Sequence, residues 1–174
     1  MQYILLAGIH GVGKSTLLQQ INEVYPIESH TISSLIKKGS SQKTTNTSKR
    51  TGQINKNQDL WKKELKNIKT TSQKIILDGH FSLLNSQGDI VALPSETFDN
   101  VNISGVILKQ EKPEIVQSRL LQRDNFNWDV AKIKTFQEVE EKSAKKYSLD
   151  TNTPLYIYND DKLLDDLISF INER

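Results

Sequence analysis

A glycine-rich octet near the start of the chain constrains the fold more than any other stretch. Residues 8–15 read Gly-Ile-His-Gly-Val-Gly-Lys-Ser, and this spacing fits the pattern G-x-x-x-x-G-K-S/T. An apolar run at residues 3–7 precedes the octet, and leucine and isoleucine recur after it at helical spacing. The pattern therefore predicts a buried strand, then a tight turn, then a helix that begins near Lys14.

This turn has the composition of a phosphate-binding loop, or P-loop. Glycine lets the backbone turn without a Cβ in the way, so successive N–H groups can form a nest for phosphate oxygens. The helix N-terminus adds unpaired donors and a partial positive charge beneath the anion. We expect Lys14 to reach the β- and γ-phosphates of ATP and Ser15 to ligate Mg²⁺. The residues predicted to bind ATP in this loop are Gly8, His10, Gly11, Val12, Gly13, Lys14, Ser15 and Thr16.

Composition narrows the class of protein. The chain has 174 residues, which suggests a single domain over residues 1–174. It contains no cysteine, which excludes disulfides and cysteine-ligated metal sites. No basic region precedes the short apolar run at the start, and no apolar stretch approaches the length of a membrane span. We therefore expect a cytoplasmic protein without a membrane partner.

Positive charge is concentrated in one part of the chain. Residues 37–74 carry ten lysines and one arginine against two acidic residues, whereas the segment from residue 159 onward is acidic. Such a patch suggests a polyanionic ligand, either a nucleotide or a nucleic acid, although for most of these lysines a solvated surface is the better interpretation. Residues 39–52 contain no apolar side chain. We expect residues 39–56 to be a mobile segment beside the acceptor, with Lys49 and Arg50 as weaker candidates for a phosphate clamp.

A second candidate site residue, an aspartate, stands at the end of a strand of the buried type. The strand predicted at residues 74–78 begins with Lys74, continues with the apolar residues 75–77 and ends in Asp78, downstream of the P-loop. A carboxylate in that place lies at the carboxyl edge of a parallel sheet, where it can hold Mg²⁺ or its waters. A helix or turn cap is the structural alternative for Asp78. We take Asp78 as a candidate both for the metal site and for catalysis.

Two arginines share one face of a later helix. Residues 113–123 read as a helix that begins with proline, and Arg119 and Arg123 are four positions apart. We predict a short lid at residues 119–129, on which both arginines neutralise charge on the transferring phosphoryl group. Arginine forks match phosphate oxygens geometrically. The predicted catalytic residues are Lys14, Asp78, Arg119 and Arg123.

Strand and helix patterns alternate along the whole chain, which predicts an α/β fold. We expect five strands, at residues 3–7, 27–30, 74–78, 101–108 and 155–158, with residues 82–94 as a loop. Alternation of this kind indicates a parallel sheet flanked by helices, here a P-loop NTPase fold. Ligands of such sheets bind at the carboxyl ends of the strands, where the P-loop and Asp78 lie.

The ordered motifs resemble the archaeal-type adenylate kinases, within the P-loop nucleoside and nucleotide kinases and the wider AAA-type ATP-binding proteins. The resemblance covers nearly the whole chain. It rests on the P-loop and on Ile76-Leu77-Asp78-Gly79-His80, Gly88 with Ala92-Leu93-Pro94, Arg119-Leu120, Gln137, Ala144, Tyr147 and Asn159-Asp160. It implies ATP and Mg²⁺ as cofactors, a nucleoside monophosphate as acceptor, and Asn159 beside the donor adenine. The chain departs from the family pattern in having fewer lid arginines and Gly79 in place of a hydroxyl residue.

These observations favour ATP- and Mg²⁺-dependent phosphoryl transfer to a small acceptor, with a nucleoside monophosphate first. A nucleoside or other small alcohol is the alternative acceptor, and it would need Asp78 as a general base. A P-loop ATPase that binds nucleic acid or acts as a regulatory switch is a second class of function. Against nucleic acid, the sequence offers no aromatic-rich strand pair for stacking bases. A nucleotide-binding protein without turnover is the third class.

Overall fold

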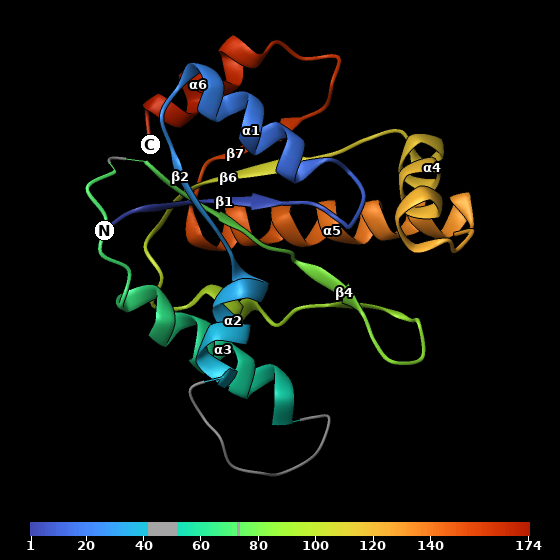
Figure 1. Cartoon of the computed structure of the whole chain (residues 1–174), viewed down its shortest axis with the longest axis horizontal. Coiled ribbons are helices and arrows are strands. Elements are labelled where there is room, and N and C mark those ends of the chain that lie inside the picture. The colour runs from blue at the N-terminus through green and yellow to red at the C-terminus, as the bar shows by residue number, and fades with distance from the viewer. Residues whose placement is uncertain (42–51, 73) are drawn as a thin grey trace.

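A five-stranded parallel sheet forms the centre of the molecule (Figure 1). The structure is a computed structural model that describes residues 1–41, 52–72 and 74–174. The strand order is β2-β3-β1-β6-β7, and every neighbouring pair is parallel. The predicted sheet is confirmed, with bounds β1 (Tyr3–Ala7), β2 (Glu28–Thr31), β3 (Ile75–Asp78), β6 (Ile103–Lys109) and β7 (Leu155–Tyr158).

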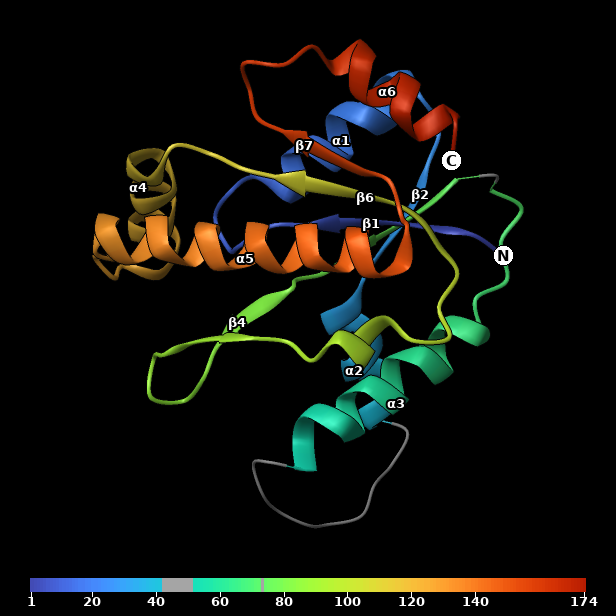
Figure 2. The same ribbon diagram turned by 180° about the vertical axis from the view of Figure 1, so that it is seen from behind.

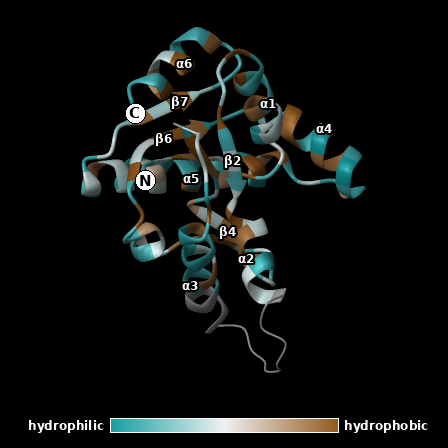
Figure 3. Ribbon diagram, turned by 60° about the vertical axis from the view of Figure 1, so that its left-hand side comes forward, coloured by the Kyte–Doolittle hydropathy of each residue, from teal (hydrophilic) through white to brown (hydrophobic). Residues whose placement is uncertain are grey.

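The central strand β1 is buried throughout its length because helices cover both faces of the sheet. On one face, Leu6 packs with residues of α1 (Lys14–Val24) and α6 (Leu164–Asn172). On the other face, Leu5 packs with residues of α3 (Gly52–Lys66) and α5 (Val130–Thr151). Figure 2 shows α5 running across that second face, and Figure 3 shows hydrophobic residues gathered along the strands.

Strand register places the two predicted motifs side by side. Leu6 in β1 is paired with Asp78 in β3, so the strand that leads into the P-loop and the strand that ends in the acid finish at the same edge. Two further helices, α2 (Ile32–Ser41) and α4 (Pro113–Asp124), begin near this edge, after β2 and β6. Among the described residues, no helix is both long enough and apolar enough to cross a membrane.

One predicted loop is wrong, because residues 82–94 contain a small antiparallel hairpin, β4 (Ser82–Leu84) with β5 (Ile90–Ala92). Strands of three residues are too short to show the two-residue alternation by which strands are recognised. The turn between them uses Gly88 at φ 84° and the Asn85 side chain, whose oxygen accepts from the backbone N–H groups of Gln87 and Asp89. A short 3₁₀ helix, η1 (Ser95–Phe98), follows the hairpin.

Of the two segments predicted to move, the structure describes the lid completely and the acceptor-side segment only in part. Residues 42–51 of the acceptor-side segment lie outside the described residues, and so do Lys49 and Arg50. Of its remaining residues, 39–41 end α2 and 52–56 begin α3. In the lid at residues 119–129, both arginines belong to α4, and residues 125–129 join α4 to α5. Motion of either segment stays a prediction.

Candidate active site

The P-loop owes its shape to glycines at positions where a side chain does not fit. Gly8 has φ 142°, and a Cβ there would lie 2.5 Å from the backbone carbonyl oxygen of Lys109. Gly13 has φ 93° and is the residue from which α1 starts. Both conformations are disfavoured for residues that carry a Cβ. The backbone can therefore take this path only with glycine at these two positions.

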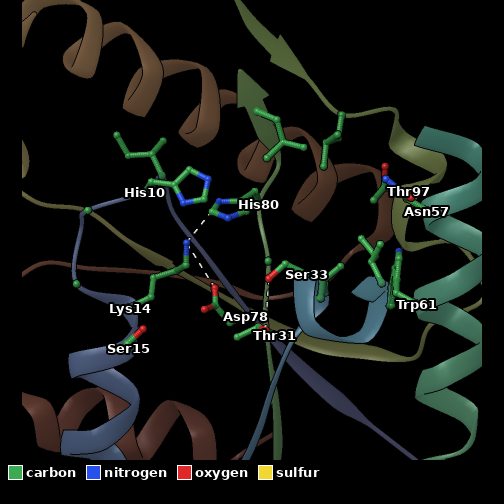
Figure 4. Close-up of a pocket in the computed structure, with 18 of the residues that line it drawn as sticks. His10, Lys14, Ser15, Thr31, Ser33, Asn57, Trp61, Asp78, His80 and Thr97 are labelled. Carbon is green, nitrogen blue, oxygen red and sulfur yellow. Dashed lines mark hydrogen bonds and ion pairs between the residues drawn. The ribbon is translucent and has the colours of Figure 1, made fainter. Parts of the chain in front are cut away.

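Lys14 lies inside the loop with its ammonium group already surrounded (Figure 4). Only 8% of the residue is exposed. Its Nζ donates to the carbonyl oxygen of Gly8 and lies 3.4 Å from Oδ1 of Asp78. Burial lowers the pKa of Lys14, and the charges of Asp78 and Glu140 act in the opposite direction. Lys14 is therefore a buried cation close to where a phosphate would bind.

His80 stands beside Lys14 as a neutral donor. Its Nδ1 lies 2.8 Å from the carbonyl oxygen of Gly8, so the proton sits on Nδ1 and is donated to that oxygen. Burial, then the charges of Lys14 and His10, lower the pKa of His80 to about 2. The ring of His10 is 4.5 Å from that of His80, and desolvation followed by the charge of Lys14 lowers the pKa of His10 too. His80 therefore orients the loop without carrying charge.

Asp78 and Ser15 face the same space from β3 and from the first turn of α1 (Figure 4). Burial raises the pKa of Asp78, and the neighbouring charge of Lys14 opposes that shift. The described residues contain no group of three or more His, Cys, Asp or Glu side chains that could hold a metal. A hydroxyl and one carboxylate nevertheless suit Mg²⁺, which is commonly held by one or two protein oxygens together with substrate phosphates and waters.

The two arginines approach the loop from α4. Arg119 donates through Nη1 to the carbonyl oxygen of Gly11 at 3.3 Å, and its Nη2 lies 3.1 Å from Glu111. Arg123 makes a two-point contact with Asp124, at 2.7 Å and 2.6 Å. Arg119 thus already contacts the P-loop, whereas Arg123 is held by its sequence neighbour.

Most of the predicted residues meet in one cavity of about 460 Å³. A second cavity of about 190 Å³ opens on the other side of the loop, beside Tyr158 and Asp160. The predicted residues that line the first cavity are His10, Gly11, Gly13, Lys14, Ser15, Thr16, Asp78, Arg119 and Arg123. Those that line the second are Val12, Gly13, Thr16 and Arg119.

Two predicted ATP-binding residues are not among those that line either cavity. The backbone of Gly8 instead makes contacts within the protein: its N–H donates to Glu140, and its carbonyl oxygen accepts from Lys14. Asn159 has a buried Oδ1 that finds no hydrogen-bond partner among the described residues. Its neighbour Asp160 does reach the second cavity, where it pairs with the buried Lys109 at 2.7 Å.

Glu140 in α5 is a site residue that the sequence pattern did not reveal. It is 1% exposed, and its Oε1 accepts from the backbone N–H groups of Gly8 at 3.1 Å and Phe81 at 2.9 Å. Its Oε2 accepts from the hydroxyl of Ser82. Burial raises the pKa of Glu140, against these hydrogen bonds and the charge of Lys14. The available signal was its place between Phe136 and Ala144, on the buried stripe of the helix.

Comparison with solved structures supports the fold. A shikimate kinase from Bacteroides thetaiotaomicron aligns with a TM-score of 0.53 and 16% identity, over 99% of this chain and 96% of its own. An uncharacterized protein from Eubacterium ventriosum ATCC 27560 aligns with a TM-score of 0.51 and 12% identity, over 100% of both chains. A gluconokinase from Sinorhizobium meliloti 1021 gives a TM-score of 0.49 at 11% identity, over 97% of this chain and 87% of its own. For the shikimate kinase and the Eubacterium ventriosum protein, likeness at these identities concerns the fold alone.

Sequence comparison adds the family. No curated protein matches the chain. Residues 7–137 match the family model described as "AAA domain". That match runs from the end of β1 through the P-loop, Asp78 and both arginines into α5. Since it covers more than half of the sequence, the chain belongs to the AAA domain family, with the α/β fold of the P-loop kinases.

Proposed function

We propose that this protein transfers the γ-phosphoryl group of ATP to a hydroxyl group of a small acceptor. One observation carries the proposal. Lys14, Asp78 and the two arginines gather at one end of a cavity of about 460 Å³, and the other end has room for a second small molecule. A donor phosphate on the P-loop would therefore face an acceptor across Asp78.

The charges at the P-loop end suit phosphoryl transfer, which depends on positioning and on neutralising charge more than on covalent chemistry. Lys14 would move from Asp78 to the β- and γ-phosphates. Arg119 would turn from Glu111 toward the oxygens of the transferring group, where its fork can make two hydrogen bonds. Ser15 and Asp78 would hold Mg²⁺, which supplies further positive charge to the phosphates when bound.

Asp78 is the group at the boundary that can take the acceptor's proton. As the acceptor oxygen forms its bond to the γ-phosphorus, the hydroxyl proton passes to the Asp78 carboxylate. The bond from that phosphorus to the β,γ-bridging oxygen breaks, and ADP leaves with the electron pair. Burial raises the pKa of Asp78, and the charge of Lys14 offsets part of that rise in the unliganded protein. Once Lys14 turns to the phosphates, that pKa rises and Asp78 becomes a better base.

A nucleoside monophosphate, the acceptor implied by the resemblance to archaeal-type adenylate kinases, is the second candidate. Its phosphate needs no base but does need a cation at the acceptor end. Among the described residues that line the cavity, the three cations, Lys14, Arg119 and Arg123, all belong to the P-loop and α4. Lys49 and Arg50 lie outside the described residues. The hydroxyl acceptor is therefore the better supported of the two.

An acceptor panel tests the proposal. ADP release from Mg²⁺-ATP would be followed with alcohols and with nucleoside monophosphates, and the product identified by phosphorus NMR. We expect acceptor-stimulated ADP release and a phosphate monoester. A nucleoside diphosphate as product would favour the second candidate. ADP release that no acceptor stimulates would indicate an ATPase, and ATP binding without release would indicate a binding protein.

A further inference from the structure

We call the uncharged part of the cavity lining the acceptor end. Apart from Asp78, Lys14 and the two arginines of α4, every described residue that lines the cavity is neutral. Figure 4 shows Trp61, Asn57 and Thr97 on the side of the space opposite to Lys14 and His10. The residues of this acceptor end are Thr31, Ile32, Ser33, Ile36, Asn57, Gln58, Trp61, Leu83, Leu93, Thr97 and Phe98.

Flat and apolar surfaces make up most of this end. The rings of Trp61 and Phe98 lie 6.1 Å apart at 60°, and both residues are buried. Ile32 and Ile36, one turn apart on α2, are half-buried beside them. Leu83 in β4 also lines the cavity, and 36% of this residue is exposed. An exposed leucine in the lining of a concave, mostly apolar site indicates that the ligand carries an apolar group.

A few neutral hydrogen-bonding groups border the same surfaces. Gln58 donates through Nε2 to the hydroxyl of Thr97 at 3.0 Å. That bond orients the Gln58 carbonyl oxygen, which accepts no hydrogen bond from another described residue. Asn57 precedes Gln58 on the same helix. Amide and hydroxyl groups recognise neutral polar edges, such as those of a heterocycle. They do not offset the cost of burying a carboxylate or a phosphate.

We infer that the acceptor is an uncharged alcohol that carries a planar ring, the chemistry of a nucleoside, with its ring against Trp61, Phe98 and Leu83. The inference rests on the proposed function for the direction of transfer, but the binding mode can be tested without turnover. The ring occupies the neutral end, and the hydroxyl points back toward Asp78. Acceptors with a carboxylate or a phosphate are bound poorly, because the described residues of the neutral end offer such groups no cation.

The test measures binding with the donor site filled. The chain has two tryptophans, so a Trp128→Phe background leaves Trp61 as the only reporter. This protein, saturated with Mg²⁺ and a non-hydrolysable ATP analogue, would be titrated with a purine nucleoside, a pyrimidine nucleoside, their 5′-monophosphates and shikimate. We expect saturable changes in Trp61 emission with at least one nucleoside, and affinity at least about tenfold weaker for its monophosphate and for shikimate.

Two pairs of variants give matched controls on exposed residues. Leu83→Ala should weaken nucleoside binding about five- to tenfold. Val91→Ala should not, since Val91 is paired with Leu83 across the hairpin but is not among the residues that line the cavity. Ser33→Arg should improve binding of the monophosphate relative to the nucleoside, because it adds a cation to the acceptor end. Ser34→Arg, on the next residue and outside the cavity lining, should leave that ratio unchanged.

The outcomes separate this inference from the proposed function. Nucleosides that bind with this pattern support the inference, even if no phosphoryl group is transferred to them and the proposed function fails. Tighter binding of shikimate or of the monophosphates by the Trp128→Phe protein overturns the inference, and so does equal loss in Leu83→Ala and Val91→Ala. Transfer to a carboxylate-bearing alcohol would leave the proposed function in place while overturning this inference.

Discussion

The two ends of the cavity have different lining chemistry, which suits the two different small molecules of the proposed function. At the P-loop end, polar groups restrain one another: Gly8 accepts from Lys14 and His80, and Arg119 contacts Gly11. At the acceptor end, the walls are rings and aliphatic chains that pack into the core. Charge therefore marks the end at which we propose that the donor phosphates bind, and its absence among the described residues of the other end supports the proposed neutral acceptor. Asp78 lies between the two ends, where it would accept the proton of the acceptor hydroxyl.

The ends also differ in the free energy at stake when one side chain is removed. A charged group aimed at the transferring phosphoryl acts mainly in the transition state, so its loss is expected to lower kcat strongly. An apolar wall contributes to binding in proportion to the area it covers, so its loss is expected to weaken binding severalfold.

The largest effect is expected for Lys14→Ala. The variant lacks the cation nearest the γ-phosphate, and kcat for phosphoryl transfer should fall by roughly 10²-fold or more. The melting temperature should fall slightly, because Asp78 loses its partner in a partly buried site. Steady-state kinetics and thermal melting check both effects, and Lys112→Ala, at an exposed lysine outside the cavity, is the control. Turnover at the wild-type rate would refute the role of the P-loop.

Asp78→Asn tests the boundary between the two ends. With a hydroxyl acceptor, kcat should fall by roughly 10²- to 10⁴-fold, the usual contribution of a general base. Burial raises the pKa of Asp78 above 3.8, so the wild-type rate should drop as pH falls through this raised pKa. The variant should lose that acid limb. His80 cannot supply it, since its pKa of about 2 keeps it neutral.

The same variant separates a base from a metal ligand. If Asp78 serves as the base, kcat of the variant should stay low even at saturating Mg²⁺, whether or not the Mg²⁺ concentration for half-maximal rate rises. A large increase in that concentration, with kcat restored at saturating Mg²⁺, would assign Asp78 to the metal alone. Asp99→Asn, at an exposed acid outside the cavity lining, should behave as the wild type in both measurements.

A smaller effect is expected when both lid arginines become lysine. Net charge is kept, but the two-point geometry of the guanidinium is lost, so kcat should fall about tenfold or more while ATP affinity changes only a fewfold. Arg119→Lys alone should carry most of the loss, since Arg119 contacts the P-loop and Arg123 is held by Asp124. Tight, steeply salt-dependent nucleic-acid binding without acceptor-stimulated ADP release would instead favour the nucleic-acid ATPase.

The sequence predicts the P-loop end of the cavity but not the acceptor end. The P-loop is contiguous, and each of its glycines has a local backbone reason, so the pattern alone predicted its strand, turn and helix. The apolar run before Asp78 likewise placed that residue at the sheet edge. In each case the information lies within a few residues along the chain.

The acceptor end is assembled from parts far apart in the sequence, and no local pattern reports such an assembly. Trp61 reads as one member of a helical apolar stripe, and only the packing of η1 against α3 brings Phe98 beside it. Leu83 belongs to a hairpin whose strands are too short to be recognised. Asn159 was predicted from a resemblance, and the structure brings Asp160 from the same loop to the second cavity instead.

Glu140 hydrogen-bonds both to the P-loop and to the segment that leads into the hairpin of Leu83. One carboxylate oxygen holds the N–H of Gly8 in the P-loop and that of Phe81, two residues before Leu83. Glu140→Ala leaves two buried N–H groups unpaired, and each should cost about 1–3 kcal/mol of unfolding free energy. Glu140→Gln keeps a carbonyl oxygen in that place and a polar partner for Ser82, so it should cost less than about 1 kcal/mol.

The glutamine variant therefore isolates the charge of Glu140 from its hydrogen bonds. That charge raises the pKa of Lys14, so removing it should lower the pKa further and move the alkaline limit of activity to lower pH. At neutral pH, kcat should stay within about threefold of the wild type, because the phosphates themselves favour protonated Lys14. Denaturant melts and a pH–rate profile measure the two effects, with exposed Glu138→Gln as the control. An alkaline limit that does not move, together with destabilisation as large as in Glu140→Ala, would make Glu140 a purely structural link between the two ends.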